Sequence, residues 1–226
     1  MAPLITPTEI AANAEVVRGR IVAAGGDLRR VQLVAVTKAH PPAVARAALA
    51  AGLTALGENY AQDLLEKVAD LAAEPPPVRA QWHFIGRLQS NKVRDLAAHV
   101  AVWHTVDRES IADAIGHRAP GATVLVQVNA SGEPQKGGCP ADPPSVAALV
   151  DRCRALGLIV VGLMAIGVAG DAAATRAAFR LTRQRADDLA LPHCSMGMTA
   201  DLEIAVEEGS TMVRVGSQLF GARPPA

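Results

Sequence analysis

The 226-residue chain has few aromatic side chains and few cysteines. It contains two tryptophans, one tyrosine and three phenylalanines, although half of its residues are hydrophobic. Its core must therefore be built from alanine, valine, leucine and isoleucine. Three widely spaced cysteines, Cys139, Cys153 and Cys194, indicate neither a disulfide framework nor a metal site. Such cysteine usage is typical of a protein in a reducing cytoplasm.

Net charge is also absent, since Lys plus Arg and Asp plus Glu each number 22. A neutral chain gives no reason to expect nucleic acid or a membrane surface as a partner. No apolar run approaches the ~20 residues that a membrane helix needs. The first residues lack the basic start and apolar run of a signal peptide. We therefore expect a cytoplasmic protein.

What the sequence does contain is a regular alternation of short apolar runs with helical segments. Strands are expected at about 33–37, 54–57, 82–85, 99–105, 122–129, 158–164, 192–195 and 211–215. A helix precedes the first strand, and only a short helical turn follows the last. This alternation predicts an α/β fold with a parallel sheet, most simply one (β/α)8 TIM-type barrel domain over residues 1–226 with an extra N-terminal helix. A doubly wound sheet is the alternative, but no Gly-x-Gly-x-x-Gly turn follows the first strand.

Lys38, at the end of the first expected strand, is the strongest candidate for chemistry. A nearly all-apolar run delivers it to the carboxyl end of the strand, where barrel sites lie. The turn His40–Pro42 then ends the strand. A solvated loop lysine is the alternative interpretation of Lys38, and neighbouring strands have to decide between the two.

The last expected strand supplies a partner for this lysine. Side chains alternate along a strand, so Arg214 and Gly216 share one face of the last strand, as Val36 and Lys38 share one face of the first. The first and last strands of a closed barrel are neighbours. If these faces are the inner ones, Lys38 and Arg214 point into the same mouth. The alternative for Arg214 is an ion pair with a barrel carboxylate such as Glu58.

The loops after the seventh and eighth strands predict an anion site. They read Ser195-Met196-Gly197-Met198-Thr199 and Gly216-Ser217, which are small and rich in hydroxyls. Barrel enzymes often hold a phosphate at these two places, on backbone N–H groups. Either loop alone reads as a capped tight turn, but together they favour phosphate. A lysine, an arginine and a phosphate cradle suggest pyridoxal 5′-phosphate, which forms a Schiff base with lysine.

The chain resembles the pyridoxal-phosphate homeostasis proteins, single-domain relatives of the alanine racemase barrel. The resemblance covers nearly the whole chain, and its carriers are LVAVTKAHP (33–41), GENYAQDLLEK (57–67), WHFIGRLQSNKV (82–93), VNASGEPQKGG (128–138), GLMAIG (162–167) and SMGMTADLEIAVEEGSTMVRVGSQLFGAR (195–223). It implies that Lys38 carries the Schiff base, that Arg214 faces the pyridine nitrogen, and that Asn59 lies beside the cofactor. The phosphate ligands would be Ser195, Thr199, Gly216 and Ser217. No metal is implied.

The resemblance also implies a role in vitamin B6 homeostasis, as a monomer that buffers the cofactor or delivers it to apo-enzymes. The alternatives are a pyridoxal-phosphate enzyme with weak racemase-like activity, and a barrel enzyme that binds a phosphorylated sugar through Lys38. Racemisation needs a second acid–base group, and the only tyrosine, Tyr60, is expected to pack or cap its own turn. The chain therefore favours carriage over catalysis.

Several other polar residues have less specific interpretations. His83 and His104 alternate with strand residues and are expected to be packed or hydrogen-bonded. Lys67 and Lys92 are expected on solvated helix surfaces. Lys136, in the long loop after the fifth strand, is a candidate transient acceptor for the cofactor. Arg87 stands where the family often has histidine, and its role stays open.

Overall fold

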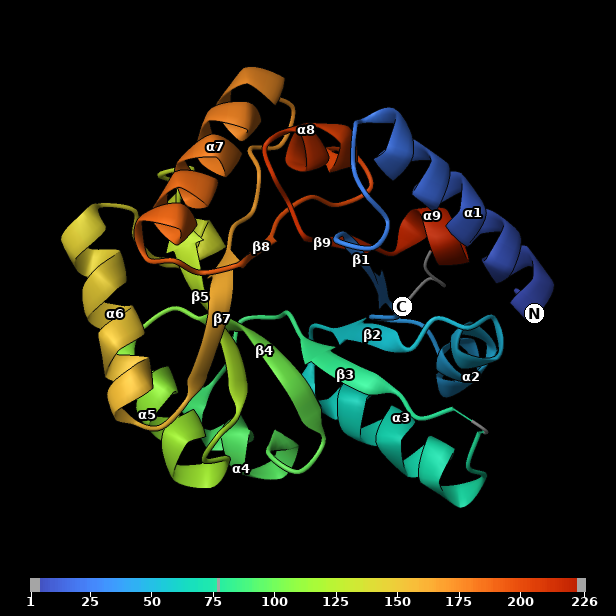
Figure 1. Cartoon of the computed structure of the whole chain (residues 1–226). Coiled ribbons are helices and arrows are strands. Elements are labelled where there is room, and N and C mark those ends of the chain that lie inside the picture. The colour runs from blue at the N-terminus through green and yellow to red at the C-terminus, as the bar shows by residue number, and fades with distance from the viewer. Residues whose placement is uncertain (1–4, 77, 223–226) are drawn as a thin grey trace.

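A computed structural model describes residues 5–76 and 78–222 of the chain, and its parallel strands close into a barrel (Figure 1). The strand order is β4-β3-β2-β1-β9-β8-β7-β5, and pairing of β4 with β5 closes the ring. The strands are β1 (Gln32–Val36), β2 (Ala55–Glu58), β3 (Gln81–Phe84), β4 (Val100–Val106), β5 (Thr123–Asn129), β7 (Ile159–Met164), β8 (His193–Ser195) and β9 (Met212–Val215). The predicted (β/α)8 barrel is confirmed.

One short strand was not expected from the sequence. β6 (Cys139–Pro140) pairs with the end of β5, so that Val128 lies opposite Cys139. It lies in the long segment between β5 and the next α-helix, and this segment also contains the 3₁₀ turn η2 (Pro134–Lys136). Two residues carry too little periodicity for a strand to be recognised in the sequence.

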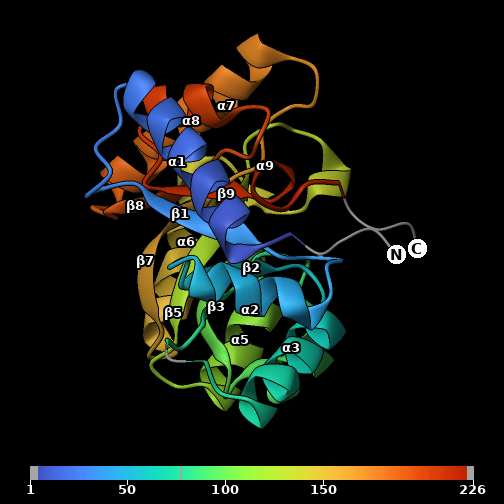
Figure 2. The same ribbon diagram turned by 90° about the vertical axis from the view of Figure 1, so that its right-hand side faces the viewer.

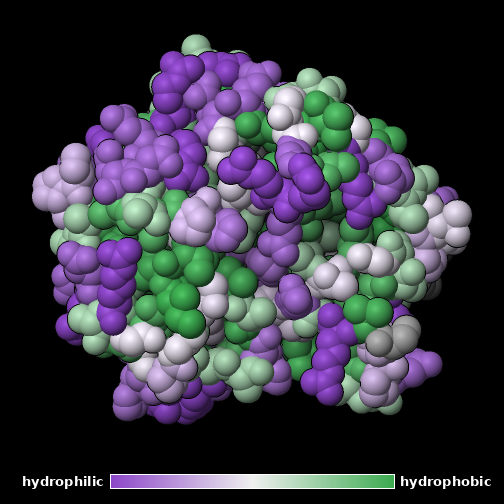
Figure 3. Space-filling view, viewed as in Figure 1, coloured by the Kyte–Doolittle hydropathy of each residue, from purple (hydrophilic) through white to green (hydrophobic). Residues whose placement is uncertain are grey.

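Helices surround the barrel and bury their apolar faces against it (Figures 1 and 2). They are α1 (Pro7–Ala23), α2 (Pro42–Ala50), α3 (Ala61–Ala73), α4 (Val93–Leu96) after the 3₁₀ turn η1 (Ser90–Lys92), α5 (Glu109–Arg118), α6 (Pro143–Ala155), α7 (Ala172–Asp188), α8 (Leu202–Glu207) and α9 (Ser217–Phe220). None of these helices combines the length and apolar character needed to cross a bilayer. Hydrophilic side chains gather over α7 on the face shown in Figure 3. Arg176 and Arg180 of α7 pair with Glu208, the residue that follows α8.

The N-terminal helix α1 covers the part of the barrel that lacks a full helix after β9. Thr6 and Glu9 form a capping box that starts it. The helix then packs against α2, α8 and α9. Asn13 donates a hydrogen bond to the carbonyl oxygen of Leu219, at 3.0 Å. The predicted extra N-terminal helix is therefore confirmed, and it covers this side of the barrel.

The barrel interior is divided between an apolar and a polar part. A small cluster of Leu125, Met164 and Met212 fills the apolar part. Other inward positions carry His83, His104, Ser195 and Arg214, all buried and polar. Buried polar groups are normally hydrogen-bonded, and the bonds among these four residues organise the site at the barrel mouth.

Candidate functional site

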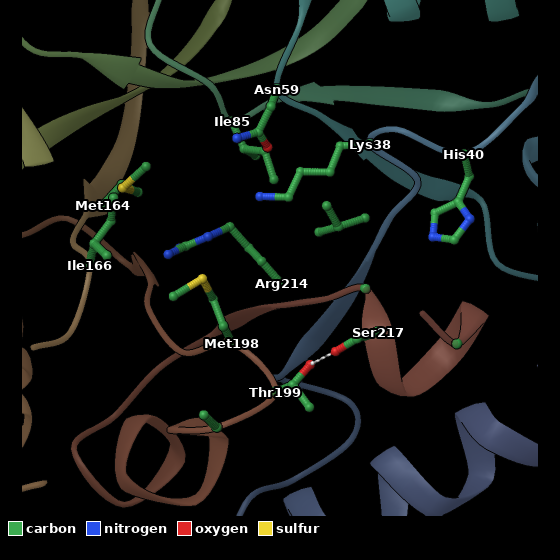
Figure 4. Close-up of a pocket in the computed structure, with 14 residues that line it drawn as sticks. Lys38, His40, Asn59, Ile85, Met164, Ile166, Met198, Thr199, Arg214 and Ser217 are labelled. Carbon is green, nitrogen blue, oxygen red and sulfur yellow. Dashed lines mark hydrogen bonds between the residues drawn. The ribbon is translucent and has the colours of Figure 1, made fainter. Parts of the chain in front are cut away.

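A pocket of about 320 Å³ opens at the carboxyl ends of the strands (Figure 4). Its walls include six of the seven residues predicted for the site: Lys38, Asn59, Thr199, Arg214, Gly216 and Ser217. Apolar side chains complete it, among them Val36, Ile85, Met164, Ile166 and Met198. An apolar pocket with a few convergent polar groups is the usual form of a cofactor site.

Lys38 and Arg214 reach this pocket from neighbouring strands. β1 and β9 pair in parallel, with Val34 opposite Arg214, and Lys38 follows the end of β1. Both side chains extend into the same space in Figure 4. The predicted inward parity of the two strands, and the meeting of Lys38 with Arg214, are confirmed.

Arg214 is buried, with 4% of its surface exposed, and neutral oxygens hold it. Its guanidinium donates to the Ser195 carbonyl at 2.7 Å, to the Ser195 hydroxyl at 2.6 Å and to the Ala165 carbonyl at 3.0 Å. Burial lowers the pKa of Arg214 to about 10, partly opposed by Asp201, so the group stays cationic at neutral pH. The alternative pairing of Arg214 with Glu58 is wrong, because Glu58 has another partner.

Ser195 does not join the predicted phosphate ligands. It is fully buried at the end of β8, beneath Arg214. Its hydroxyl accepts from Arg214 and lies 2.9 Å from Nδ1 of His104, whose Nε2 is 2.8 Å from Nδ1 of His83. The structure thus assigns Ser195 to a hydrogen-bonded chain behind Arg214, in place of the expected contact with phosphate.

Burial favours the neutral form of the two histidines in this hydrogen-bonded network. Burial lowers the pKa of His83 to about 4. Burial also lowers the pKa of His104 well below its ordinary value, with smaller contributions from His83 and Arg214. The expectation that both histidines are packed or hydrogen-bonded is confirmed. They extend the support of Arg214 across the barrel interior.

The loops after β8 and β9 bring two hydroxyls together at the pocket wall. The oxygens of Thr199 and Ser217 lie 3.4 Å apart. Arg20 of α1 donates to the Thr199 carbonyl at 2.9 Å and pairs with Glu203 at 2.6 Å. Gly216 passes so close to β1 that a Cβ atom would lie 3.1 Å from the Val36 carbonyl oxygen. The two hydroxyls, with Gly216 between β9 and α9, form the part of the site suited to a phosphate.

Asn59 supplies a polar atom without a partner among the described residues. Its Oδ1 is buried but makes no hydrogen bond there, although buried polar atoms normally have one. The turn that holds it packs against Gly86, where a Cβ atom would come within 1.9 Å of the Asn59 carbonyl oxygen. Together with an amine, a buried guanidinium and two hydroxyls, this set of polar groups fits a phosphorylated aldehyde such as pyridoxal phosphate.

A second buried polar cluster lies behind β1 and was missed in the sequence. Lys67 of α3 is 1% exposed, so the expectation of a solvated surface lysine is wrong. Its Nζ lies 2.5 Å from Glu58 Oε1 and donates to the Thr37 carbonyl at 2.8 Å. Burial raises the pKa of Glu58, an effect that Lys67 opposes. The spacing Leu64, Lys67, Leu71 on the buried stripe of α3 is the signal that reveals it.

Three other expectations concern residues around the mouth. Tyr60 stands at the N-cap position of α3, but its side chain is 59% exposed and makes no capping hydrogen bond within the described chain, so the prediction that this side chain packs or caps is wrong. Lys136 forms an ion pair with Glu133 and donates to the Gly167 carbonyl at 2.7 Å. Arg87 lines a separate hollow of about 740 Å³ that shares Asn59 with the site.

Comparisons with known proteins agree with this geometry. The family model of the alanine racemase N-terminal domain matches residues 5–224. The pyridoxal phosphate homeostasis protein of Pseudomonas aeruginosa is 46% identical over 222 residues, which cover 95% of this chain and 94% of the relative. That of Escherichia coli K12 is 38% identical over 232 residues, covering 95% and 97%.

Solved structures give the same picture. PipY of Synechococcus elongatus PCC7942, solved with pyridoxal phosphate bound, superposes with a TM-score of 0.81 and 35% identity, covering 94% of this chain and 100% of PipY. Alanine racemase of Clostridium difficile 630 has a TM-score of 0.74 at 15% identity, with 95% of this chain and 58% of the racemase covered. This second likeness concerns the fold alone.

Proposed function

The chain belongs to the pyridoxal phosphate homeostasis proteins of the alanine racemase N-terminal domain family, and on that premise we propose that it binds pyridoxal 5′-phosphate on Lys38 and takes part in its homeostasis. The observation that carries the proposal is the meeting of Lys38, Arg214 and the Thr199–Ser217 hydroxyl pair in one pocket. Homologues named for this role, and PipY with the cofactor bound, support it.

Each polar residue of the pocket has a place in this proposal. When bound, pyridoxal phosphate supplies an aldehyde that condenses with a primary amine, one C=N bond forming as one water leaves. Lys38 provides the amine, and Thr199, Gly216 and Ser217 bind the phosphate. Arg214 faces the ring nitrogen as a fixed cation, which disfavours protonation of that nitrogen. Asn59 lies beside the ring.

The finer points of the role are part of the same proposal. We propose that the protein is a monomer that buffers the cofactor and delivers it to apo-enzymes in the cytoplasm. Its three free thiols are all buried, as suits a reducing compartment. Light scattering should give the mass of one chain, and incubation of the loaded protein with an apo-enzyme should restore that enzyme's activity.

An absorption spectrum tests the binding proposal. The wild-type protein mixed with pyridoxal phosphate should show the visible band of a Schiff base, and Lys38→Ala should lose it. Lys92→Ala is the matched control, because Lys92 is exposed and lies outside the pocket. A wild-type protein that stays colourless would overturn the proposal. To separate carriage from catalysis, α-proton exchange of D- and L-alanine in deuterated water should be far slower than enzymatic rates.

A further inference from the structure

Helix α3 reaches the turn that carries Lys38 from outside the barrel. The Thr37 carbonyl, which belongs to the peptide group before Lys38, accepts from Lys67 Nζ at 2.8 Å and from the His40 N–H at 3.1 Å. The Thr37 hydroxyl donates to Glu58 Oε1 at 2.5 Å, the same oxygen that pairs with Lys67. The residue before Lys38 is therefore held at both its carbonyl and its side chain.

The residue after Lys38 is held by the same helix. Ala39 has a φ of 58°, a left-handed conformation that residues with a side chain rarely adopt. Its N–H donates to Asp63 Oδ2 at 3.3 Å, in the first turn of α3. Such conformations persist where the surroundings impose them, and they cluster at functional sites. Both neighbours of Lys38 are thus bound by side chains of α3.

Glu58 and Lys67 hold Thr37 without lining the pocket. Glu58 is fully buried and Lys67 is 1% exposed, and both lie between the barrel and α3. A buried ion pair is weak evidence for stability, because well-packed apolar residues often serve as well at such a position. The neighbouring stripe residues Leu64 and Leu71 show that α3 packs here with leucine. The pair therefore needs an explanation beyond packing, and the Thr37 carbonyl supplies one.

We infer that Glu58 and Lys67 are positioning residues that fix the Thr37–Lys38 peptide and so present the Lys38 amine to the cofactor aldehyde. The inference rests on the proposed function. It assigns the pair to the covalent step, and it leaves recognition of the phosphate and ring to the opposite wall of the pocket, with Arg214, Thr199 and Ser217.

The test separates attachment from recognition. The double variant Glu58→Gln/Lys67→Met removes both charges together, so neither is left buried alone. Recognition is measured by calorimetry with pyridoxine 5′-phosphate, which has the ring and phosphate but no aldehyde. Attachment is measured as the rate at which borohydride traps pyridoxal phosphate on Lys38, followed by mass spectrometry. Lys92→Met is the matched control.

The inference predicts a split between these two readouts. In the double variant the attachment rate should fall about tenfold or more, since small misplacement of a reacting group is costly. Affinity for pyridoxine 5′-phosphate should stay within about twofold, because its binding groups are untouched. Asp63→Ala, which releases the Ala39 N–H at the rim, should slow attachment by a smaller factor. Unchanged attachment in both variants, or an equal loss of analogue affinity, would overturn the inference.

Hydrogen exchange of the unliganded protein gives an independent readout. The His40 amide, bonded to the Thr37 carbonyl, should exchange about tenfold faster in the double variant, with the second half of α3 unchanged. Unchanged exchange would contradict the inference even if no cofactor bound. If the wild-type protein fails to attach pyridoxal phosphate at all, the proposed function fails instead, so the two failures are distinguishable.

Discussion

Two buried polar clusters flank the pocket, and they differ in how their charge is balanced. Inside the barrel, the Arg214 guanidinium is held by neutral oxygens of Ser195 and Ala165. Behind β1, the Lys67 ammonium is paired with the Glu58 carboxylate at 2.5 Å. A buried cation without a directly bound counter-ion is costly. Of the cations in these two clusters, Arg214 lines the pocket and Lys67 does not. The comparison separates a ligand-facing cluster, with charge left for a ligand, from a supporting cluster whose charge is already balanced.

The largest change in stability is expected in the supporting cluster of Glu58 and Lys67. Lys67→Met leaves the Glu58 carboxyl buried without its partner, so the free energy of unfolding should fall by about 3–5 kcal/mol. Urea unfolding measures this loss. Glu58→Gln/Lys67→Met, which removes both charges, should recover most of it. A single variant as stable as the wild type would show that the pair is not electrostatically coupled.

The ligand-facing cluster should instead appear in the pH dependence of stability. The pKa of His83 is lowered from 6.5 to about 4 by burial, so between these pH values the unfolded chain binds more protons than the folded chain. Stability should therefore be complete above pH 6.5 and fall as the pH drops towards 4. His83 alone accounts for about 3 kcal/mol at pH 4, and burial of His104 acts in the same direction.

Urea unfolding at a series of pH values checks this prediction. His83→Gln should give a profile that is flatter by roughly one bound proton over the same window. The same slope in His83→Gln and the wild type would mean that the imidazole is not buried in its neutral form.

Arg214→Met tests whether the charge of the ligand-facing cluster is used in ligand binding. The variant removes a cation that the cofactor ring is expected to use, and a hydrogen bond from a charged group contributes about 1.5–3 kcal/mol. Calorimetry should show pyridoxine 5′-phosphate binding weakened by about ten- to a hundredfold. Its loss of stability should be smaller than that of Lys67→Met, because no unpaired charge is left behind. Unchanged affinity would remove Arg214 from the binding site.

The smallest effect is expected at the two hydroxyls. Thr199→Val and Ser217→Ala should each weaken binding of pyridoxal phosphate by about 1 kcal/mol, or about fivefold. Pyridoxal, which lacks the phosphate, is the control ligand, and its affinity should not change. A loss shared by both ligands would place these hydroxyls elsewhere in the site.

Strand positions and strand parity could be predicted from the sequence because apolar runs repeat at short, regular intervals. The same parity predicted that Lys38 and Arg214 meet, which depends only on barrel closure and alternation. Strand parity indicates which face of the sheet a side chain lies on, but not how far below the pocket that side chain lies. Ser195 points inwards as expected, but the Arg214 guanidinium, bonded to its hydroxyl, lies between it and the pocket.

The supporting cluster escaped prediction for a different reason. Lysine is almost never fully buried without a partner, so the residue type favours a solvated surface for Lys67 despite its position on the apolar stripe of α3. Its partner Glu58 lies on another element, and only tertiary packing brings the two together. Tyr60 is the opposite case, because it is expected to pack but is exposed. Its exposure depends on how the turn before α3 leaves the barrel.

The central claim, that the cofactor is held on Lys38, is tested most directly by mass spectrometry. The protein loaded with pyridoxal phosphate is reduced with borohydride, digested, and its peptides are sequenced. The account predicts the pyridoxyl group mainly on Lys38, with none on the buried Lys67 or the exposed Lys92. A pyridoxyl group mainly on another lysine, or on no lysine, would contradict it.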